Sequence, residues 1–381
     1  MKKFKIMSVF GTRPEAIKMA PLVKTLAQRP EFESICCLTG QHRQMLDSVM
    51  EIFGLQAQYD LNIMQAQQTL STITTKTLLG MDSVIEDCKP DLILVHGDTS
   101  TTFAGALSAF YHKVPVGHVE AGLRTYDPYS PYPEEMNRTL VGDIAHLHFS
   151  PTVSNAENLK KEAIKGEIFI TGNTVIDAMA TTVRENFSFG IPELDALDFA
   201  NKKVIVMTCH RRENYGQPME NIMQAARQIV LEHEDVELVY PVHLSPVVQE
   251  CAKRNLGDLE RVHLVPPVNV EQMHNLMARC YLVMTDSGGL QEEAPAMGKP
   301  VLVLRRETER PEAVEAGTVK LAGVEKQTIV TMARELLTDS AAYEAMAKAV
   351  NPYGDGKACQ RISDAIAWYF GLTDQRPEDR L

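Results

Sequence analysis

Three acidic side chains lie at or near the ends of predicted strands, where they could carry out acid–base chemistry. Asp98 follows the apolar run LILVHG and Glu120 follows PVGHV. Pro133 suits the first position of a helix that would display Glu134 or Glu135 near them. Paired carboxylates in a closed cleft can have their pKa values pushed apart, so that one becomes an acid and another a base. A solvated loop is the alternative, and it is disfavoured because Asp98 and Glu120 both end strands of the buried type.

The stretch FGTRPEAIK offers groups that could hold an anion. Gly11 permits close approach of the backbone, Pro14 suits the first helical position, and free N–H groups at such a helix start attract negative charge. Arg13 and Lys18 add positive charge. An ordinary strand-to-helix turn with a solvated arginine is the alternative, and this stretch alone does not separate the two.

The stretch TDSGGLQEEAP combines a hydroxyl and two glycines at a helix start. These residues are Ser287, Gly288 and Gly289. A diphosphate could lie on their N–H groups while Glu292 or Glu293, one turn later, takes a ribose diol. The alternative is a capped helix with Asp286 or Ser287 as the N-cap. Capping does not require the double glycine, so the nucleotide interpretation is favoured.

Two further stretches place arginines after predicted strands. In TCHRREN, His210 stands beside Arg211 and Arg212. A histidine at a strand end is often only a structural hydrogen-bonding group, but next to two arginines it favours contact with an anion. Arg310 stands before a proline in a second strand-Arg-Pro-Glu arrangement, which is a weak signal by itself.

Several familiar site patterns are missing from the sequence. There is no GxGxxG after a predicted strand and no GxxxxGK[ST], so NAD-binding and P-loop functions lose their main support. No spaced His/Cys set and no DxD cluster indicates a bound metal. We therefore expect neither a metal nor a cofactor.

The composition indicates a water-soluble protein of two domains. The chain has 381 residues, 44% of them hydrophobic, and no apolar run approaches the roughly 18 to 20 residues of a membrane span. The formal charge of −12 argues against binding to nucleic acid or to a membrane surface. The seven cysteines form no CxxC pair and lie in apolar runs, as reduced core thiols do. The first residues show no cleavage site, so we expect a cytoplasmic location.

Short apolar runs alternate with segments of helical period, and this pattern runs twice along the chain. Such runs are typical of a buried parallel sheet with helices on both faces. The polar, weakly periodic stretch Thr181–Lys203 separates the two sets and is a candidate linker. We therefore predict two doubly wound, Rossmann-like α/β domains. Because ligands of such sheets bind beyond the carboxyl ends of the strands, two facing edges would form an interdomain active-site cleft.

These motifs together resemble the bacterial non-hydrolysing UDP-N-acetylglucosamine 2-epimerases. The resemblance spans nearly the whole chain, through FGTRPEAIKMAPL, HGDTSTTFAGALSAF, HVEAGLRT, YSPYPEEMNR, HRREN, TDSGGLQEEAP and ERPEAVEAGT. It implies the glycosyltransferase-B architecture, with residues 1–170 plus 364–381 in an N-terminal domain and 171–363 in a UDP-binding domain. It also implies a cytoplasmic homodimer that supplies precursors for cell-surface polysaccharides.

The resemblance implies a reaction and a set of site residues. UDP-GlcNAc and UDP-ManNAc would interconvert by elimination of UDP to 2-acetamidoglucal and re-addition. The catalytic residues implied are Asp98, Glu120, Glu134 and His210. The substrate-binding residues implied are Arg13, Lys18, Ser287, Gly288, Gly289 and Arg310 at the phosphates and Glu293 at the ribose. Val268 and Met273 stand where relatives often have a Gln and an aromatic residue around the uracil.

Bacterial members often bind a second UDP-GlcNAc as an activator. The matching positions here are Gln41, Gln44, Arg211 and His243. Gln67 stands where some relatives have an arginine, so we expect an activator site with altered affinity.

Three alternatives stay open from the residues. The chain could be a hydrolysing relative that releases ManNAc and UDP, or a sugar-nucleotide sensor without activity. A glycosyltransferase of the same architecture is also compatible with the fold alone.

Overall fold

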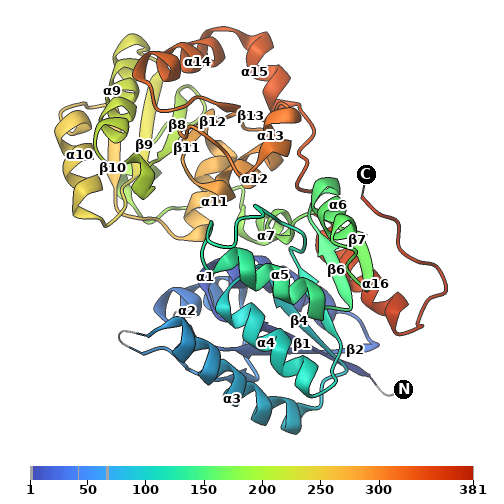
Figure 1. Cartoon of the computed structure of the whole chain (residues 1–381). Coiled ribbons are helices and arrows are strands. Elements are labelled where there is room, and N and C mark those ends of the chain that lie inside the picture. Colours follow the sequence, from blue (N-terminus) through green and yellow to red (C-terminus); the bar gives the residue numbers. More distant parts are fainter. Residues whose placement is uncertain (1–2, 42, 66–67, 381) are drawn as a thin grey trace. The chain divides into compact units, whose positions relative to one another are not determined.

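The computed structural model describes residues 3–41, 43–65 and 68–380. The chain divides into two compact units, Met1–Thr181 with Tyr353–Leu381 and Thr182–Pro352. Each unit is a parallel sheet flanked by helices (Figure 1), which confirms the prediction of two doubly wound α/β domains.

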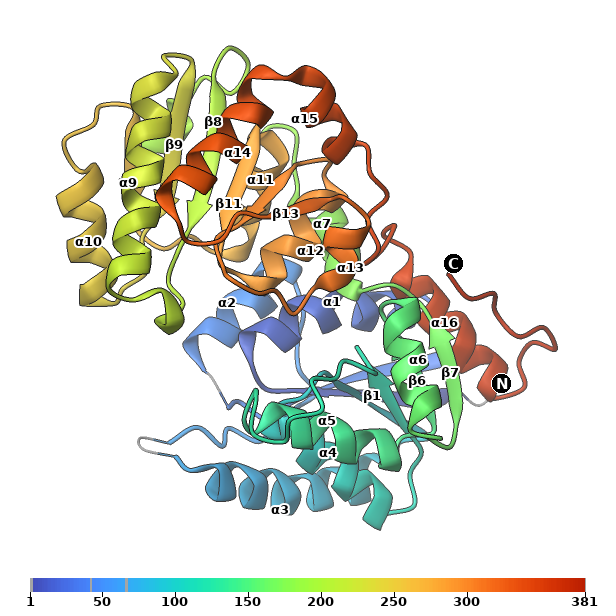
Figure 2. The same cartoon turned by 45° about the horizontal axis from the view of Figure 1, so that its top comes forward.

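The first unit is built on seven parallel strands in the order β3-β2-β1-β4-β5-β6-β7. The strands are β1 (Phe4–Phe10), β2 (Phe32–Leu38), β3 (Tyr59–Asp60), β4 (Leu92–His96), β5 (Val116–Val119), β6 (Leu147–Ser150) and β7 (Glu167–Ile170). The helices are α1 (Arg13–Ala27), α2 (Gln44–Phe53), α3 (Leu70–Cys88), α4 (Ser100–Tyr111), α5 (Glu134–Ile144), α6 (Val153–Lys161), α7 (Thr174–Thr182) and α16 (Ala358–Tyr369). Figure 2 shows α3, α4 and α5 on one face of this sheet and α1 and α2 on the other.

The second unit is built on six parallel strands in the order β10-β9-β8-β11-β12-β13. The strands are β8 (Lys203–Thr208), β9 (Val236–Pro241), β10 (Val262–Val265), β11 (Leu282–Thr285), β12 (Val301–Val303) and β13 (Val319–Leu321). The helices are α8 (Pro192–Asp195), η1 (Arg212–Asn214), α9 (Gln217–Glu232), α10 (Pro246–Leu256), α11 (Val270–Arg279), α12 (Gly288–Ala296), α13 (Pro311–Glu315), α14 (Lys326–Thr338) and α15 (Ser340–Ala347).

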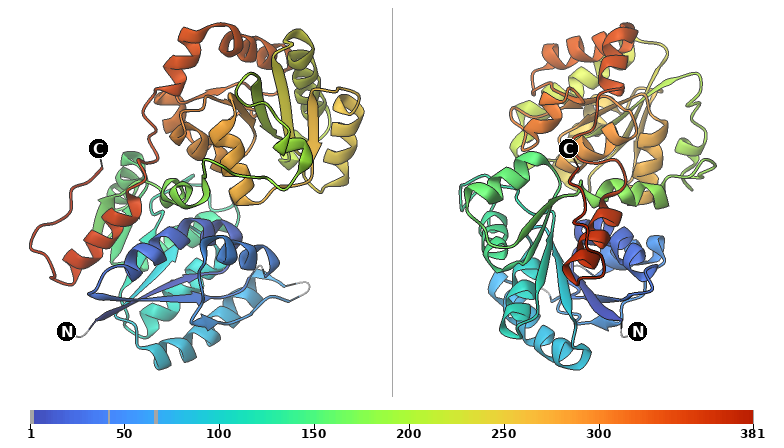
Figure 3. Two further views of the ribbon diagram at one scale, coloured as in Figure 1. Left: turned by 180° about the vertical axis from the view of Figure 1, so that it is seen from behind. Right: turned by 90° about the vertical axis from the view of Figure 1, so that its right-hand side faces the viewer.

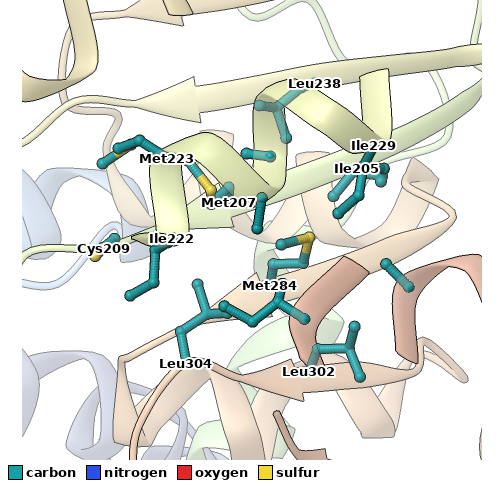
Figure 4. Packing of buried hydrophobic residues seen from close by; sticks show 14 of the residues in the cluster. Ile205, Met207, Cys209, Ile222, Met223, Ile229, Leu238, Met284, Leu302 and Leu304 are labelled. Carbon is teal, nitrogen blue, oxygen red and sulfur yellow. The ribbon is translucent and has the colours of Figure 1, made fainter. Parts of the chain in front are cut away.

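The core of the second unit shows why its strands are continuous apolar runs. Strands of a parallel sheet are buried on both faces, so both sets of side chains must be apolar. Figure 4 shows Ile222 and Met223 of α9 packed with Met207 of β8 and Met284 of β11, all of them buried. The same alternation of apolar strands and amphipathic helices produces the core of the first unit.

The cysteines belong to these cores. All seven are free and buried, which confirms the prediction of core thiols. Burial raises the pKa of Cys36 and of Cys280 to about 12, so both stay protonated. No helix among the described residues is both long enough and apolar enough to cross a membrane.

The C-terminal helix α16 packs on the first unit, although it follows the second unit in the chain. Figure 3 shows this red helix beside the blue part of the first unit. The Phe4 and Phe370 rings stack with centroids 4.2 Å apart, and Arg29 pairs with Asp364 at 2.5 Å. An ion pair within the helix and an aromatic stack at its C-terminal end therefore hold α16 on the first unit.

The boundaries of the two units differ from those expected. Residues 171–181 and 353–363 lie in the first unit, whereas the sequence placed them in the second. The reason is a pair of long-range hydrogen bonds: the Asp177 carboxylate in α7 accepts the backbone N–H groups of Ala358 and Cys359, at 3.1 and 2.8 Å. These hydrogen bonds join α7 to the start of α16, so both belong to the first unit.

The strand order reverses once in each sheet, between β1 and β4 and between β8 and β11. In open α/β sheets, ligands bind beyond the carboxyl ends of the strands at such a reversal. In the first unit, residues 11–13 and 97–98 follow these strands. In the second unit, residues 209–211 and 286–288 do so. The polar residues singled out in the sequence therefore lie at the ends of the strands, as predicted.

Candidate functional site

The Glu120 carboxylate lies directly after β5 and is surrounded by donors. Its Oε2 accepts hydrogen bonds from Lys18 Nζ and from Asn173 Nδ2, the latter at 2.9 Å, and His96 Nε2 lies 3.5 Å away. Burial by itself would raise the pKa of Glu120, but Lys18 and His96 outweigh it and hold the pKa well below its ordinary value. Glu120 is therefore ionised at neutral pH.

The backbone of Glu120 is also unusual. Its φ of 63° lies in the left-handed region, which costs an L-residue roughly 1–2 kcal/mol. The hydrogen bonds from Lys18 and Asn173 help to offset this strain. Strain of this kind in a turn that bears a buried charge is typical of a functional position.

Asp98 lies two residues beyond β4, and its environment differs from that of Glu120. Burial raises the pKa of Asp98 to about 6, although the Arg138 guanidinium, with Nη1 3.2 Å from Oδ2, opposes this. The negative charges of Glu120 and Glu134 raise the pKa further. Asp98 and Glu120 thus lie close enough to interact, and their pKa values move in opposite directions.

The structure places Glu134 and Glu135, at the start of α5, in different surroundings. Glu135 is buried, pairs with Arg138 and accepts the backbone N–H groups of Thr125 and Tyr126. It therefore holds the loop before the helix. Glu134 is partly exposed and lies close enough to Asp98 to affect its pKa, so it is the one available for chemistry. We call Asp98, Glu120 and Glu134 the carboxylate cluster.

Three side chains that support this cluster were missed from the sequence: His96, Arg138 and Asn173. His96 is the last residue of β4 and Asn173 follows β7, so the rule of strand ends could have found both. Arg138 lies one turn after Glu134 on the same helix, which is a weaker signal. Within the described residues, no group of three or more metal-ligating side chains is arranged to hold an ion.

The loop before α1 differs from the anion site expected there. The backbone N–H groups of Gly11 and Thr12 donate to Glu15 Oε2 at 3.1 and 2.7 Å, so the prediction that they are free is wrong. Gly11 is needed for packing, because an added Cβ would lie 1.9 Å from Thr39 Oγ1. Lys18, expected at a phosphate, contacts Glu120. Arg13 begins α1 and is partly exposed.

In the second unit, the fully buried Asp286 organises the loop after β8. Its Oδ2 accepts the backbone N–H groups of His210 and Arg211, both at 2.8 Å, and Nδ2 of Asn214 at 3.1 Å. Its Oδ1 lies 3.4 Å from Nδ1 of His210. Burial lowers the pKa of His210, and the Asp286 carboxylate offsets only part of this effect. Asp286 therefore holds the backbone and the ring of His210 in place and does not cap a helix.

Two guanidinium groups converge on the start of α12. An added Cβ at Gly288 would lie 3.8 Å from Arg310 Nη2 and 3.9 Å from Arg211 Nη2. The Arg310 Nε donates to Glu292, which fixes this arginine. Positive side chains at the positive end of a helix make a site for an anion. We call His210, Arg211, Ser287, Gly288, Gly289 and Arg310 the anion site.

The remaining predicted residues fall in different places. Glu293 Oε1 would lie 3.2 Å from a Cβ added at Gly289, so its carboxylate lies beside the start of α12. Val268 is buried and Met273 partly buried, before and within α11.

The residues expected at an activator site are divided between the units. Gln41 accepts a hydrogen bond from Thr101 Oγ1 at 3.0 Å in the first unit. The His243 ring stacks on His210 in the second unit, with centroids 5.3 Å apart, and Arg211 belongs to the anion site. Gln67 and the side chain of Gln44 lie outside the described residues.

A family model and curated relatives match nearly the whole chain. The family model described as UDP-N-acetylglucosamine 2-epimerase matches residues 24–367. The chain is 55% identical over 379 residues to UDP-N-acetylglucosamine 2-epimerase of Bacillus subtilis, covering 99% of each chain. It is 51% identical over 372 residues to the Escherichia coli K12 enzyme, covering 95% of this chain and 98% of the other.

Solved structures agree with these relatives. A crystal structure of a protein from Listeria monocytogenes, described as a UDP-N-acetylglucosamine 2-epimerase, has a TM-score of 0.94 at 51% identity and full coverage of both chains. The Neisseria meningitidis UDP-GlcNAc 2-epimerase bound to UDP-GlcNAc has a TM-score of 0.86 at 46% identity, covering 96% of this chain and 100% of the other. The chain belongs to the UDP-N-acetylglucosamine 2-epimerase family.

Proposed function

We propose that this chain interconverts UDP-GlcNAc and UDP-ManNAc by eliminating UDP and adding it back. The observation that carries this proposal is the pair of neighbouring carboxylates with opposite pKa shifts, Asp98 and Glu120. C2 of the sugar is not next to a carbonyl group, so its proton is poorly acidic. Loss of UDP makes removal of that proton productive, because the electron pair forms a C1–C2 double bond.

Each group of the carboxylate cluster would have a separate function. Asp98, with a pKa near the working pH, would take the C2 proton while the C1–O bond breaks and its electrons leave with the diphosphate. Glu120, which stays ionised, would stabilise positive charge that develops at C1. Glu134 would exchange a proton with C2 on the face of the sugar ring opposite to Asp98. When UDP adds back through its phosphate oxygen, C2 regains a proton and the alkene is lost.

The anion site would hold the departing diphosphate. The guanidinium groups of Arg211 and Arg310 and the start of α12 supply positive charge, and His210 lies on the same loop as Arg211. Stabilisation of a leaving group by such fixed groups is a large part of many catalysed reactions. Arg13 would add a further contact to a phosphate, and Glu293 would contact the ribose.

The resemblance also supports three wider proposals. These are a homodimer, a cytoplasmic location and the supply of precursors for cell-surface polysaccharides. Sedimentation velocity of the purified chain tests the first of them, and a monomer at working concentrations would contradict it.

Solvent isotope exchange tests the reaction. Incubation of UDP-GlcNAc with the enzyme in deuterated water should yield UDP-ManNAc and place deuterium at C2 of both sugars, because the proton on Asp98 exchanges with solvent. Proton NMR measures the label. Asp98→Asn keeps the shape of the side chain and should lower the rate of labelling by about 100-fold or more.

Other outcomes favour the alternatives. Free ManNAc and UDP as the main products would indicate a hydrolysing enzyme. Binding of UDP-GlcNAc without labelling or turnover would indicate a sensor. A need for an acceptor sugar would indicate a glycosyltransferase.

The pH dependence of kcat/KM should report the ionisation of Asp98. Because the protonated carboxyl cannot accept the C2 proton, kcat/KM should fall about tenfold per pH unit below a pKa near 6. The positive charge of Arg138 lowers this pKa, so Arg138→Gln should move the acid limb to higher pH. Arg138→Lys keeps the charge and should move it less. An acid limb at the same pH in Arg138→Gln and in the wild type would contradict this assignment.

We also propose that a second UDP-GlcNAc activates the enzyme through Gln41, Gln44, Arg211 and His243. The stacking of His243 on His210 supports this, since a ligand at His243 would change the position of a residue of the anion site. Trace UDP-GlcNAc should therefore accelerate turnover of UDP-ManNAc severalfold in initial-rate assays. His243→Ala should remove the acceleration, whereas the exposed Gln249→Ala on α10 should not. Simple Michaelis kinetics unaffected by trace UDP-GlcNAc would contradict the proposal.

A further inference from the structure

A buried histidine on α11 links the candidate ribose carboxylate to the end of α7. His274 is 1% exposed, and its Nε2 lies 3.3 Å from Oε2 of Glu293. Its Nδ1 lies 2.6 Å from the hydroxyl of Thr182. Thr182 is the last residue of α7 and the first residue of the second unit. The three side chains form a chain of polar contacts across the interior of the second unit.

The chemistry of these groups indicates which ring nitrogen of His274 carries a proton. An ionised carboxylate has no proton to donate, so the nitrogen that faces Glu293 must carry one. With the ring proton on Nε2, Nδ1 is an acceptor, and the Thr182 hydroxyl donates to it. Nε2 of His274 makes no hydrogen bond within the described residues, and the carboxylate of Glu293 lies beside it. A buried N–H without an acceptor is unfavourable. A small rotation of the Glu293 carboxylate toward Nε2 would give this N–H an acceptor and would align the carboxylate.

The position of Thr182 is fixed separately by Asn275, the next residue of α11. Its Nδ2 donates to the Thr182 carbonyl at 2.7 Å, and its Oδ1 accepts the Arg184 N–H at 2.9 Å. Asn275 is fully buried. Asn275 thus holds the backbone of Thr182, and the neighbouring His274 accepts a hydrogen bond from the Thr182 hydroxyl. These contacts leave the His274 ring little freedom to rotate.

We propose that His274 is a positioning residue that aligns Glu293 with the ribose and so makes the chain select ribonucleotides over 2′-deoxyribonucleotides. This inference rests on the proposed function, in which Glu293 contacts the ribose. A carboxylate that is turned toward two neighbouring hydroxyl groups can accept one hydrogen bond on each oxygen. Glu293 Oε1 lies by the start of α12 and Oε2 lies by His274, so rotation of the carboxylate away from His274 would lose one of the two contacts.

Binding of UDP and 2′-deoxy-UDP to the full chain, measured by titration calorimetry, tests this inference. The wild type should bind UDP about tenfold or more tightly than 2′-deoxy-UDP. His274→Leu removes both ring nitrogens and should bring this ratio close to one. His274→Gln can place an N–H near the position of Nε2 and should keep most of the selectivity. A merely structural function of His274 would change both affinities and leave their ratio unchanged.

Matched variants keep the test decisive. Met277→Ala removes a buried side chain of the same helix, so it should lower the melting temperature and leave the ratio unchanged. If His274→Leu does not fold, Thr182→Val removes only the hydroxyl that orients the ring and should lower the ratio severalfold.

Glu293→Gln distinguishes a failure of the ribose contact of Glu293 from a failure of the positioning function of His274. A wild-type ratio in Glu293→Gln would show that Glu293 does not read the ribose, and the ribose contact of the proposed function would then fail. A ratio lost in Glu293→Gln and kept in both His274→Leu and Thr182→Val would overturn the positioning function of His274 alone.

Discussion

Burial of the Glu120 charge is the constraint on which the carboxylate cluster depends. A carboxylate can be buried in ionised form only when donors replace the water that it loses. The donors here are Lys18 from α1 and Asn173 from the segment after β7, and His96 at the end of β4 lies 3.5 Å from the carboxylate. These segments are far apart in the sequence, and the parallel sheet brings them together because its strands end at one edge. The fold of the first unit therefore supplies the donors that a buried charge on Glu120 needs.

The same burial produces different chemistry at Asp98. Asp98 is close to Arg138, but it also faces the negative charges of Glu120 and Glu134, and burial outweighs the arginine. One carboxylate is thus kept ionised while its neighbour titrates near neutral pH. The second unit repeats the principle with Asp286, whose buried carboxylate holds the backbone N–H groups of His210 and Arg211 in place. In both units a buried acid accepts hydrogen bonds from groups at the carboxyl ends of the strands.

Much of this arrangement could be predicted from the sequence, because it follows from short-range patterns. Apolar runs between helical segments predicted both sheets, and the polar residues that follow those runs included Asp98, Glu120 and His210. The double glycine predicted the start of α12, where Arg310 does lie.

Pairing over long distances could not be predicted. Nothing near Lys18 in the sequence indicates that its partner is Glu120, and nothing in FGTRPEAIK shows that Glu15 takes the N–H groups of Gly11 and Thr12. The observed boundary between the units differs from the predicted one for the same reason, because Asp177 accepts hydrogen bonds from residues far along the chain. The sequence predicted that His210 beside Arg211 and Arg212 contacts an anion, and it also matched Arg211 to an activator site. Only the folded backbone shows that Arg211 lies by Gly288.

In the proposed reaction, the carboxylate cluster promotes cleavage of the C1–O bond, and the anion site keeps UDP bound until it adds back. Positional isotope exchange tests this claim most directly. UDP-GlcNAc with oxygen-18 in the bridge between C1 and the β-phosphate should, after turnover, be recovered with part of the label in the non-bridging β-phosphate oxygens, because the freed phosphate rotates before re-addition. Phosphorus NMR resolves the two positions. Label that stays in the bridge while C2 is inverted would contradict the claim.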